Sequence, residues 1–483
     1  MNAIRKTQHG KRLTRAIQAC VLSLAFCAVS GCILPGEDPE PPPGGDPLAA
    51  YVDTLKDNPT DIEAHANLLR EQIKRGDVEG AQATVSHALF HISKDFRSHM
   101  LAAQFHRWQY DFLSAEKQLF EARELSPSNV EPRLALAALY RDAMLEREEL
   151  EQRRLAVALV APEFKAELDL DYAFSLAQAG EGKAASEAAQ RVIDAKGAGN
   201  SRFRAWILLG QIALDGGREE DAVAAALAAR NEAPKERGPV RFAARLAGAL
   251  QNPEPLLALF EDVLAKQEDP DSRFFALFGA WTATTKLAVI LSQDADGERP
   301  HEFWTRLRDL DPGQLDALSR RYQVISLLPK RKEETQALRQ MLDNMQVGVP
   351  PLTNTLPELV RLWRAQDSLM LSAARPSLRE IEQLQPRWPS RDLFLLKANA
   401  LFGARLDDAC MALLAQLKEP GKEEMAELRF MRWVVQIRQG QAIAVMREIE
   451  AMGEQQKADN ATLLMLAITR FRTYRKTADA GGK

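Results

Sequence analysis

From Leu48 onward, apolar residues recur at the three- and four-residue spacing of amphipathic helices, and no segment shows the strict alternation of a half-buried strand. The pattern also repeats over a longer interval. Ala81 recurs as Ala115 and Ala88 recurs as Ala122, 34 residues later in both cases. This spacing is typical of stacked helix-turn-helix units. The sequence therefore predicts an all-α protein built by repetition.

The most regular unit begins at Trp206 and ends at Pro234. We expect Trp206 to fill the space between paired helices, and Gly210 to let two backbones approach closely. Gly217 permits a tight turn, because glycine adopts positive φ without steric cost. Pro234 ends the second helix, since it cannot continue the hydrogen-bond ladder.

The run Trp206-x-x-Leu209-Gly210-x-x-Ala213, followed by Gly217, Ala222, Ala229 and Pro234, resembles the tetratricopeptide repeat (TPR) family. About six copies cover roughly residues 60–268, although the charged stretch 146–154 blurs the second helix of the third copy. The resemblance implies an α-solenoid, a right-handed superhelix of helix-turn-helix repeats. A second block, clearest over residues 396–420, is TPR-like. We therefore predict a TPR array over 48–270, an irregular helical joint over 271–355, a TPR-like block over 356–475 and a frayed tail over 476–483.

The segment that ends at Gly31 reads as a secretory signal. Residues 1–15 carry five basic residues and no acidic one, and the apolar run 19–29 that follows is too short to span a membrane comfortably. The run ends in Val29-Ser30-Gly31-Cys32, which resembles the lipobox of bacterial lipoproteins. The resemblance implies cleavage before Cys32 and acylation of its sulfur and its new amine. A plain signal peptide cut after Gly31 and an uncleaved helical anchor are the alternatives.

Residues 32–47 are expected to form a lipidated cysteine and a tether. The stretch 35–47 is rich in proline and glycine, which favours an extended chain of roughly 3.1 Å per residue. Ile33 and Leu34 follow Cys32 where an inner-membrane retention signal would carry aspartate. Resemblance to enterobacterial sorting therefore implies the outer membrane, with the protein facing the periplasm.

Composition and charge narrow the class of partner. The 483 residues carry a net charge of −4, and removal of residues 1–31 takes away five basic residues and no acidic one, which leaves −9. Nucleic acid is therefore an unfavourable partner. Three of the four cysteines lie within the signal and at Cys32, so no disulfide framework is expected. We expect Cys410, the fourth, to be buried by packing.

No enzyme motif occurs, so we predict a protein that is not an enzyme and needs no cofactor. Histidine use is unusual, because five of the seven histidines lie within the first two repeats. His87 and His91 are one helical turn apart and form a weak candidate metal pair. The preferred interpretation is packing, since His65 and His99 occupy the place that Trp206 takes in its own unit.

The TPR resemblance implies that the first helix of each pair lines a groove that holds a peptide. Register assigns to this groove Arg70, Lys74, Arg97, Arg107, Trp108, Arg141, Phe174, Arg204, Gln211, Arg241 and Arg245. The row is basic in an acidic protein and would suit an acidic or carboxylate-bearing segment. Trp108 and Phe174 would be apolar anchors. Ordinary solvated arginines are the equally weighted alternative.

These features together predict a non-catalytic, membrane-anchored scaffold or adaptor in a periplasmic or envelope assembly. The chain resembles outer-membrane TPR lipoproteins, some of which assist pilus, secretion or exopolysaccharide-export machines. A regulatory binding module for a cell-wall enzyme is one alternative, and a helical envelope hydrolase is another, of a different class. The expected partner is another protein or peptide segment, with the membrane held through the lipid.

Overall fold

A computed structural model describes residues 47–195, 199–266, 269–291, 374–384, 391–417, 426–453 and 459–481. Within these ranges every regular element is a helix and no strand occurs, which confirms the all-α prediction. The predicted signal, Cys32 and the tether up to residue 46 lie outside the described residues, and Pro47, its last residue, begins a helix. The predicted joint beyond Leu291, up to residue 355, also lies outside the described residues.

The chain forms two compact units. Unit 1 joins the residues up to Leu168 with those from Met425 onward, and unit 2 is Asp169–Glu424. This grouping differs from the predicted separation of residues 48–270 from residues 356–475. The last helices belong with the first repeats, because α26 (Asn460–Gly481) packs against α6 (Phe112–Leu125).

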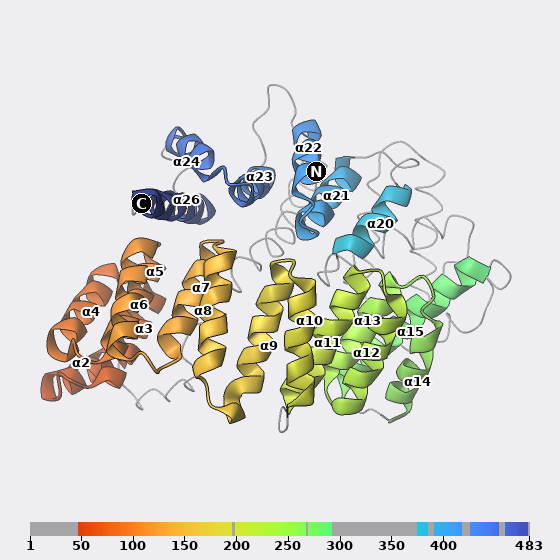
Figure 1. Cartoon of the computed structure of the whole chain (residues 1–483), viewed down its shortest axis with the longest axis horizontal. Helices are drawn as coiled ribbons and strands as arrows, with labels where there is room; N and C mark the ends of the chain where they lie inside the picture. The colour runs from red at the N-terminus through yellow and green to blue at the C-terminus, as the bar shows by residue number, and fades with distance from the viewer. Residues whose placement is uncertain are drawn as a thin grey trace, which may run out of the picture. The chain divides into compact units, whose positions relative to one another are not determined.

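Unit 1 is built from helices that pack in consecutive antiparallel pairs (Figure 1). A leading helix, α2 (Pro47–Asp57), packs on α3. The pairs are α3 (Ile62–Arg75) with α4 (Val78–Ile92), α5 (Phe96–Trp108) with α6, and α7 (Glu131–Asp142) with α8 (Glu146–Leu159). The charged stretch in the third repeat therefore does form its second helix, α8, in which Glu149 and Arg153 pair at 2.9 Å.

The other helices of unit 1 come from the end of the chain. They are α23 (Ala426–Arg438), α24 (Ala442–Glu450) and α26, and α26 packs on both of the others. The sequence pattern predicts that the last helix ends near residue 475, with a frayed tail after it. In the structure α26 continues to Gly481.

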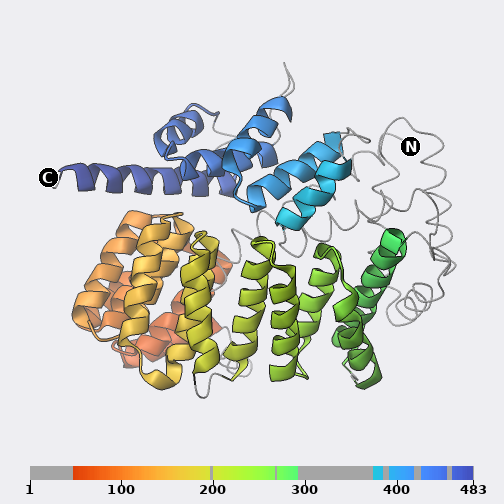
Figure 2. The ribbon, with the colours of Figure 1, turned by 45° about the vertical axis from the view of Figure 1, so that its right-hand side comes forward.

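Unit 2 continues the pairing, as the turned view in Figure 2 shows. It begins within α9 (Pro162–Gln178), which an ion pair between Asp169 and Arg191 links to α10. The following helices are α10 (Gly182–Asp194), α11 (Asn200–Asp215), α12 (Glu219–Glu232), α13 (Arg237–Ala249), η1 (Glu254–Leu256), α14 (Leu257–Lys266), α15 (Pro270–Leu291), α20 (Ala374–Leu384), α21 (Arg391–Gly403) and α22 (Asp407–Leu417). Cys410 is fully buried in α22, as predicted.

Seven turns between described helices share a common backbone geometry. The first helix ends in a residue with left-handed φ, and the next amide donates to a carbonyl five residues earlier, as in Leu145 N to Tyr140 O at 2.8 Å. This residue is glycine in four turns, which confirms the predicted role of Gly217. The left-handed residues are Gly76, Tyr110, Met144, Gly180, Gly217, Arg405 and Gly440, and the first three keep the spacing of the core alanines.

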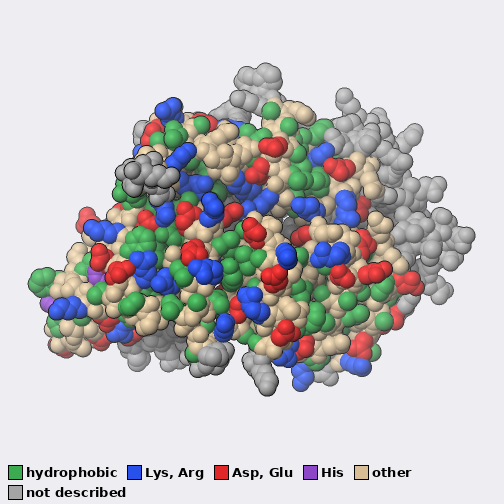
Figure 3. Space-filling view, viewed as in Figure 1, with side chains coloured by type: hydrophobic (Ala, Val, Ile, Leu, Met, Phe, Trp, Pro, Cys, Tyr) green, Lys and Arg blue, Asp and Glu red, His purple; other side chains and the backbone are tan. Residues whose placement is uncertain are grey.

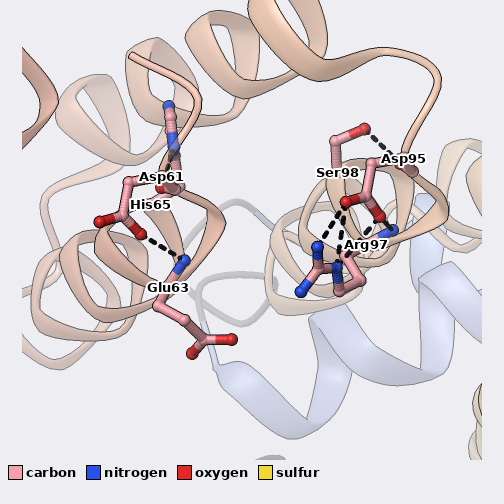
Figure 4. Close-up of polar contacts among 6 residues, drawn as sticks. All are labelled: Asp61, Glu63, His65, Asp95, Arg97 and Ser98. Carbon is pink, nitrogen blue, oxygen red and sulfur yellow. Dashed lines mark hydrogen bonds and ion pairs between the residues drawn. The ribbon is translucent and has the colours of Figure 1, made fainter. Parts of the chain in front are cut away.

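Aspartates begin the helices of the first two repeats. Asp61 accepts hydrogen bonds from the amides of Glu63 and Ala64, both at 3.0 Å, and Asp95 accepts from the amide of Arg97 at 2.9 Å (Figure 4). Asp77 and Asp111 cap α4 and α6 in the same way. Each cap contributes about 1 kcal/mol to helix stability. Asp95 follows Asp61, and Asp111 follows Asp77, at the repeat interval of the core alanines.

Small residues bring neighbouring helices close together. Ala81, Ala88 and Ala122 are fully buried, so the alanines that define the interval lie in the core. Trp206 packs against Phe203, Ala229 and Ala233. A methyl group on Gly210 would lie 2.7 Å from two atoms of the Phe242 ring in α13. The predicted close approach at Gly210 is therefore a contact with the next repeat.

Candidate functional site

Three basic residues of the predicted groove, on α3 and α5, have partners on their own helices or caps. Arg70 donates to Asn67 at 2.8 Å, and Lys74 pairs with Glu71 at 2.9 Å. Arg97 pairs with the cap residue Asp95 at 2.6 Å (Figure 4). Lys74 and Arg97 are exposed, and surface pairs of this kind contribute at most about 1 kcal/mol. These cations can therefore exchange their partners for a ligand at small cost.

Arg107 differs from the other predicted groove residues, because it joins two repeats. Its Nε donates to Asp142 Oδ2 at 2.6 Å, and a second nitrogen contacts the same oxygen. The Asp142 side chain is 7% exposed and the Arg107 side chain 20%. Burial raises the pKa of Asp142, although Arg107 and Arg141 act in the opposite direction. The geometry assigns Arg107 to the contact between α5 and α7.

Asp142 is the partner of Arg107 that the sequence pattern did not predict. A signal was present, since Asp142 follows Arg107 at close to one repeat interval. Arg141 precedes Asp142 and is half-buried; among the described residues its Nε finds no hydrogen-bond partner. Trp108 is also half-buried and packs against the core between α3, α4 and α5, with its ring centre 6.2 Å from that of Phe105.

Unit 2 holds a polar cluster on α11 and α13. Gln211 donates to Asp215 Oδ1 at 2.9 Å, and Asp215 also attracts Arg245 electrostatically. Burial lowers the pKa of Arg245 to about 10, which marks a guanidinium poorly compensated for the water it has lost. Within the described ranges, Arg245 Nε and Gln211 Oε1 are buried without a hydrogen-bond partner. Gln211 Oε1 is an acceptor and would not favour an anion, so Arg245, with its poorly compensated charge, is the part of the cluster suited to an anionic group.

Exposed basic residues lie on the same two helices. Arg204 on α11 and Arg241 on α13 are both exposed. The Arg241 guanidinium lies 5.9 Å from the centre of the Phe275 ring on α15, an arrangement that leaves its donors available. Phe174 on α9 is half-buried. The structure thus places Arg241 and Arg245 within one helical turn of α13, and Asp215, which accepts from Gln211, attracts Arg245.

Charges of both signs are interspersed on the face shown in Figure 3, with no patch of a single sign over the described helices. Specific recognition would depend on a few arginines rather than on a broad field.

The clustered histidines of the first repeat contact one another. His65 is fully buried; its Nδ1 lies 2.7 Å from Asp61 O and its Nε2 lies 2.9 Å from His87 Nδ1. The His87 and His91 ring centres are 4.3 Å apart. His65 thus fills the packing place that the sequence predicts for it. Within the described ranges, no group of three metal-ligating side chains has a geometry that could hold an ion.

The His65–His87 contact predicts a loss of stability at mildly acidic pH. Burial lowers the pKa of both rings, so below the ordinary value of 6.5 the unfolded chain gains protons that the folded chain resists. Stability is therefore full above pH 6.5 and declines as the pH falls below it. We expect the thermal midpoint to fall between pH 7.5 and pH 5.5. His87→Gln, which can donate to His65 without titrating, should flatten this dependence; a wild-type midpoint independent of pH in this window would contradict the assignment.

Among the described residues, no helix has the length and apolar character needed to cross a membrane. No family model and no curated relative matches the chain. Solved structures that it resembles include Naa15/Naa10 bound to HypK-THB, with 14% identity and a TM-score of 0.23 over 89% of this chain and 76% of that one. The P58(IPK) TPR domain matches at 12% identity and a TM-score of 0.20, over 79% and 99% of the two chains. Yeast Tom70 matches at 11% identity and a TM-score of 0.25, over 89% and 97%. At such TM-scores the fold assignment rests on the helix pairs and turns of this chain alone.

Proposed function

We propose that the protein is a non-catalytic scaffold that binds an acidic or carboxylate-bearing segment of another protein. Stacked helix pairs support this role, because repetition builds a long surface from few residue types. The observation that carries the proposal is the cluster on α11 and α13. There, within the described residues, Arg245 Nε is buried without an acceptor and the exposed Arg241 lies beside it.

A carboxylate supplies what this cluster lacks. It is a planar acceptor that can take two hydrogen bonds from one guanidinium, and charge-assisted bonds of this kind are roughly twice as strong as neutral ones. Gln211 supplies no donor to the carboxylate, since its side-chain nitrogen already donates to Asp215 at 2.9 Å and its remaining Oε1 is itself an acceptor. Taken by itself, unit 1 offers the exposed Arg97 and Lys74 as separate candidate contacts for an acidic segment.

Reversing the charge of two exposed arginines tests this surface. Arg204→Glu with Arg241→Glu should weaken binding of a fluorescent Asp/Glu-rich peptide by at least about tenfold, since like charges then face each other. Because both side chains are exposed, the free energy of unfolding should stay within about 0.5 kcal/mol of wild type. Fluorescence anisotropy with the full-length protein measures the affinity.

Lys235→Glu is the control, because Lys235 is exposed in the loop between α12 and α13 and undergoes one charge reversal of the same kind, half the change in the double variant. Its affinity for the peptide should follow the wild type apart from a small general effect of net charge. Equal losses in the control and in the double variant would reject the assignment of the cluster.

We further propose that a lipid on Cys32 anchors this scaffold to a bacterial membrane. Ile33 and Leu34, which replace the aspartate of an inner-membrane retention signal, favour the outer membrane, with the protein on the periplasmic side. The support is the sequence Val29-Ser30-Gly31-Cys32 after a basic and apolar leader. An envelope assembly of the pilus, secretion or exopolysaccharide-export type would be its setting.

Cys32→Ser should move the protein from the membrane pellet to the soluble fraction, because serine cannot receive the thioether-linked lipid. Fractionation followed by immunoblotting measures the shift, and mass spectrometry of the wild-type N-terminus measures the acyl groups. Cys410→Ser is the control, since that thiol is buried in α22. Retention of the Cys32→Ser protein in the pellet would overturn the lipid anchor.

A further inference from the structure

The C-terminal helix α26 makes a set of contacts that the binding surface on α11 and α13 does not explain. It runs across the ends of α5–α8 at the side where the turns inside the repeats lie, in both Figure 1 and Figure 2. We call this side of the second and third repeats the turn edge: Tyr110, Phe112, Glu116, Tyr140, Ala143, Met144 and Glu148. It belongs to unit 1, as α26 does.

Arg475 is the centre of the contact. Its guanidinium pairs with Glu116, lies 3.7 Å from Glu148 and stacks 4.9 Å from the centre of the Tyr140 ring. Tyr140 is buried and donates to the same Glu116 oxygen at 2.8 Å. One arginine therefore contacts acidic and aromatic side chains from α6, α7 and α8.

Arg472, one turn earlier, recognises the backbone. It donates to Ala143 O at 3.2 Å and also to Met144 O, which are carbonyls left free where α7 ends. A cation at this place also complements the negative end of the helix dipole. Met144 itself has φ of 55°, a conformation that L-residues adopt at a cost, so the bound carbonyls belong to a strained turn.

Apolar contacts complete the contact between α26 and the turn edge. The Phe471 and Phe112 rings meet edge to face with centres 5.9 Å apart, and both side chains are buried. Tyr110, the other non-glycine residue of left-handed φ in these turns, has its pKa raised by burial and by Asp459 just before α26. The α26 side of the contact is thus the sequence Phe471-Arg472-Thr473-Tyr474-Arg475.

We propose that the turn edge is a docking site for an arginine-bearing helix of the pattern Phe-Arg-x-x-Arg, which α26 occupies reversibly in the free protein. The occupant can leave without unfolding, because α26 has its own core with α23 and α24, where Met465 and Ile468 are buried. The acidic edge and the basic helix are complementary in charge. The acidic turn edge would repel the acidic segment proposed above, so the two sites can be tested separately.

Opening the contact in the full-length protein tests the proposal. Arg475→Glu places like charges together, and backbone amides 140–148 should then exchange hydrogen at least about tenfold faster than in wild type. The charge-swap double variant, Glu116→Lys with Arg475→Glu, should restore slow hydrogen exchange, which a misfolded chain could not do. Arg470→Glu is the control, because Arg470 pairs with Glu450 at 3.2 Å inside the C-terminal helices.

Binding in trans tests whether the site accepts a free helix. The full-length double variant Arg472→Ala with Arg475→Ala leaves the turn edge open. A labelled peptide of residues 459–481 should bind it at least about tenfold more tightly than it binds the wild type, whose site is occupied. Added salt should weaken this binding. The same peptide with both arginines replaced should not bind. Unchanged amide exchange in Arg475→Glu, or equal peptide binding to the wild type and the opened variant, would overturn the docking site.

Discussion

Arg107→Ala is expected to lower the free energy of unfolding by about 3 kcal/mol, because it leaves the carboxylate of Asp142 buried without its partner. The Asp142 side chain is 7% exposed, so water cannot replace the guanidinium. Urea unfolding followed by circular dichroism measures the change. Arg97→Ala, which removes an exposed arginine paired with Asp95, should cost less than about 1 kcal/mol.

The pH dependence of Arg107→Ala gives a second measure of the same interaction. Burial already raises the pKa of Asp142, and removal of Arg107 takes away a group that opposes this rise. A raised pKa in the folded state favours folding below it and disfavours folding above it. The deficit of the variant should therefore shrink as the pH falls.

Asp142→Asn in the Arg107→Ala background should recover much of the lost stability, since an amide is cheaper to bury than an unpaired charge. A variant as stable as wild type at neutral pH would show that Arg107 is a free groove residue after all. In that case its charge reversal would again be informative for partner binding.

Gly210→Ala is expected to destabilise unit 2 by about 2 kcal/mol, the usual cost of adding a methyl group to a closely packed contact. The new Cβ would lie 2.7 Å from two atoms of the buried Phe242 ring and 3.1 Å from Ala225 Cβ. Neither helix can move without disturbing the repeat beyond it. Thermal unfolding of the full-length protein measures the loss.

Gly248→Ala in α13 is the matched control for this change. No heavy atom lies within 4 Å of the added methyl group, and alanine favours a helix, so a gain of about 0.5 kcal/mol is expected. Phe242→Leu should rescue part of the Gly210→Ala loss. Equal effects of the two glycine substitutions would contradict a contact between α11 and α13 at Gly210.

Much of the fold could be predicted, because the information is local or periodic. The turn at Gly217, the core alanines and the ends of most helices follow from spacing and residue type alone. Asp61 and Asp95, which cap the first helices, are also one repeat interval apart, so the sequence pattern could have predicted both caps. The helical content of α8 was harder to read, since its charged residues pair along the helix and hide its apolar face.

The candidate site was predicted less well, and the reason is physical. Register places Arg107 and Arg241 on equivalent helices, but only the structure shows that Asp142 holds the first while the second stacks near Phe275. The contact of Arg475 with Glu116 joins residues 359 apart, and no local pattern encodes it. A repeat determines its own pairing, whereas a helix that returns from the far end of the chain does so through individual side chains.

Because α26 lies far along the chain from the turn edge, it is synthesised much later than the residues it covers. Arg472 follows Met144 by 328 residues, so the edge is complete long before its occupant exists. At a synthesis rate of about 5 to 20 residues per second, the interval is roughly 16 to 66 s. A chain emerging with its N-terminal end first, from a ribosome or a translocation channel, therefore presents Glu116 and Tyr140 uncovered. Any chaperone or partner with a suitable helix has its first opportunity during biogenesis, before competition from the chain itself begins.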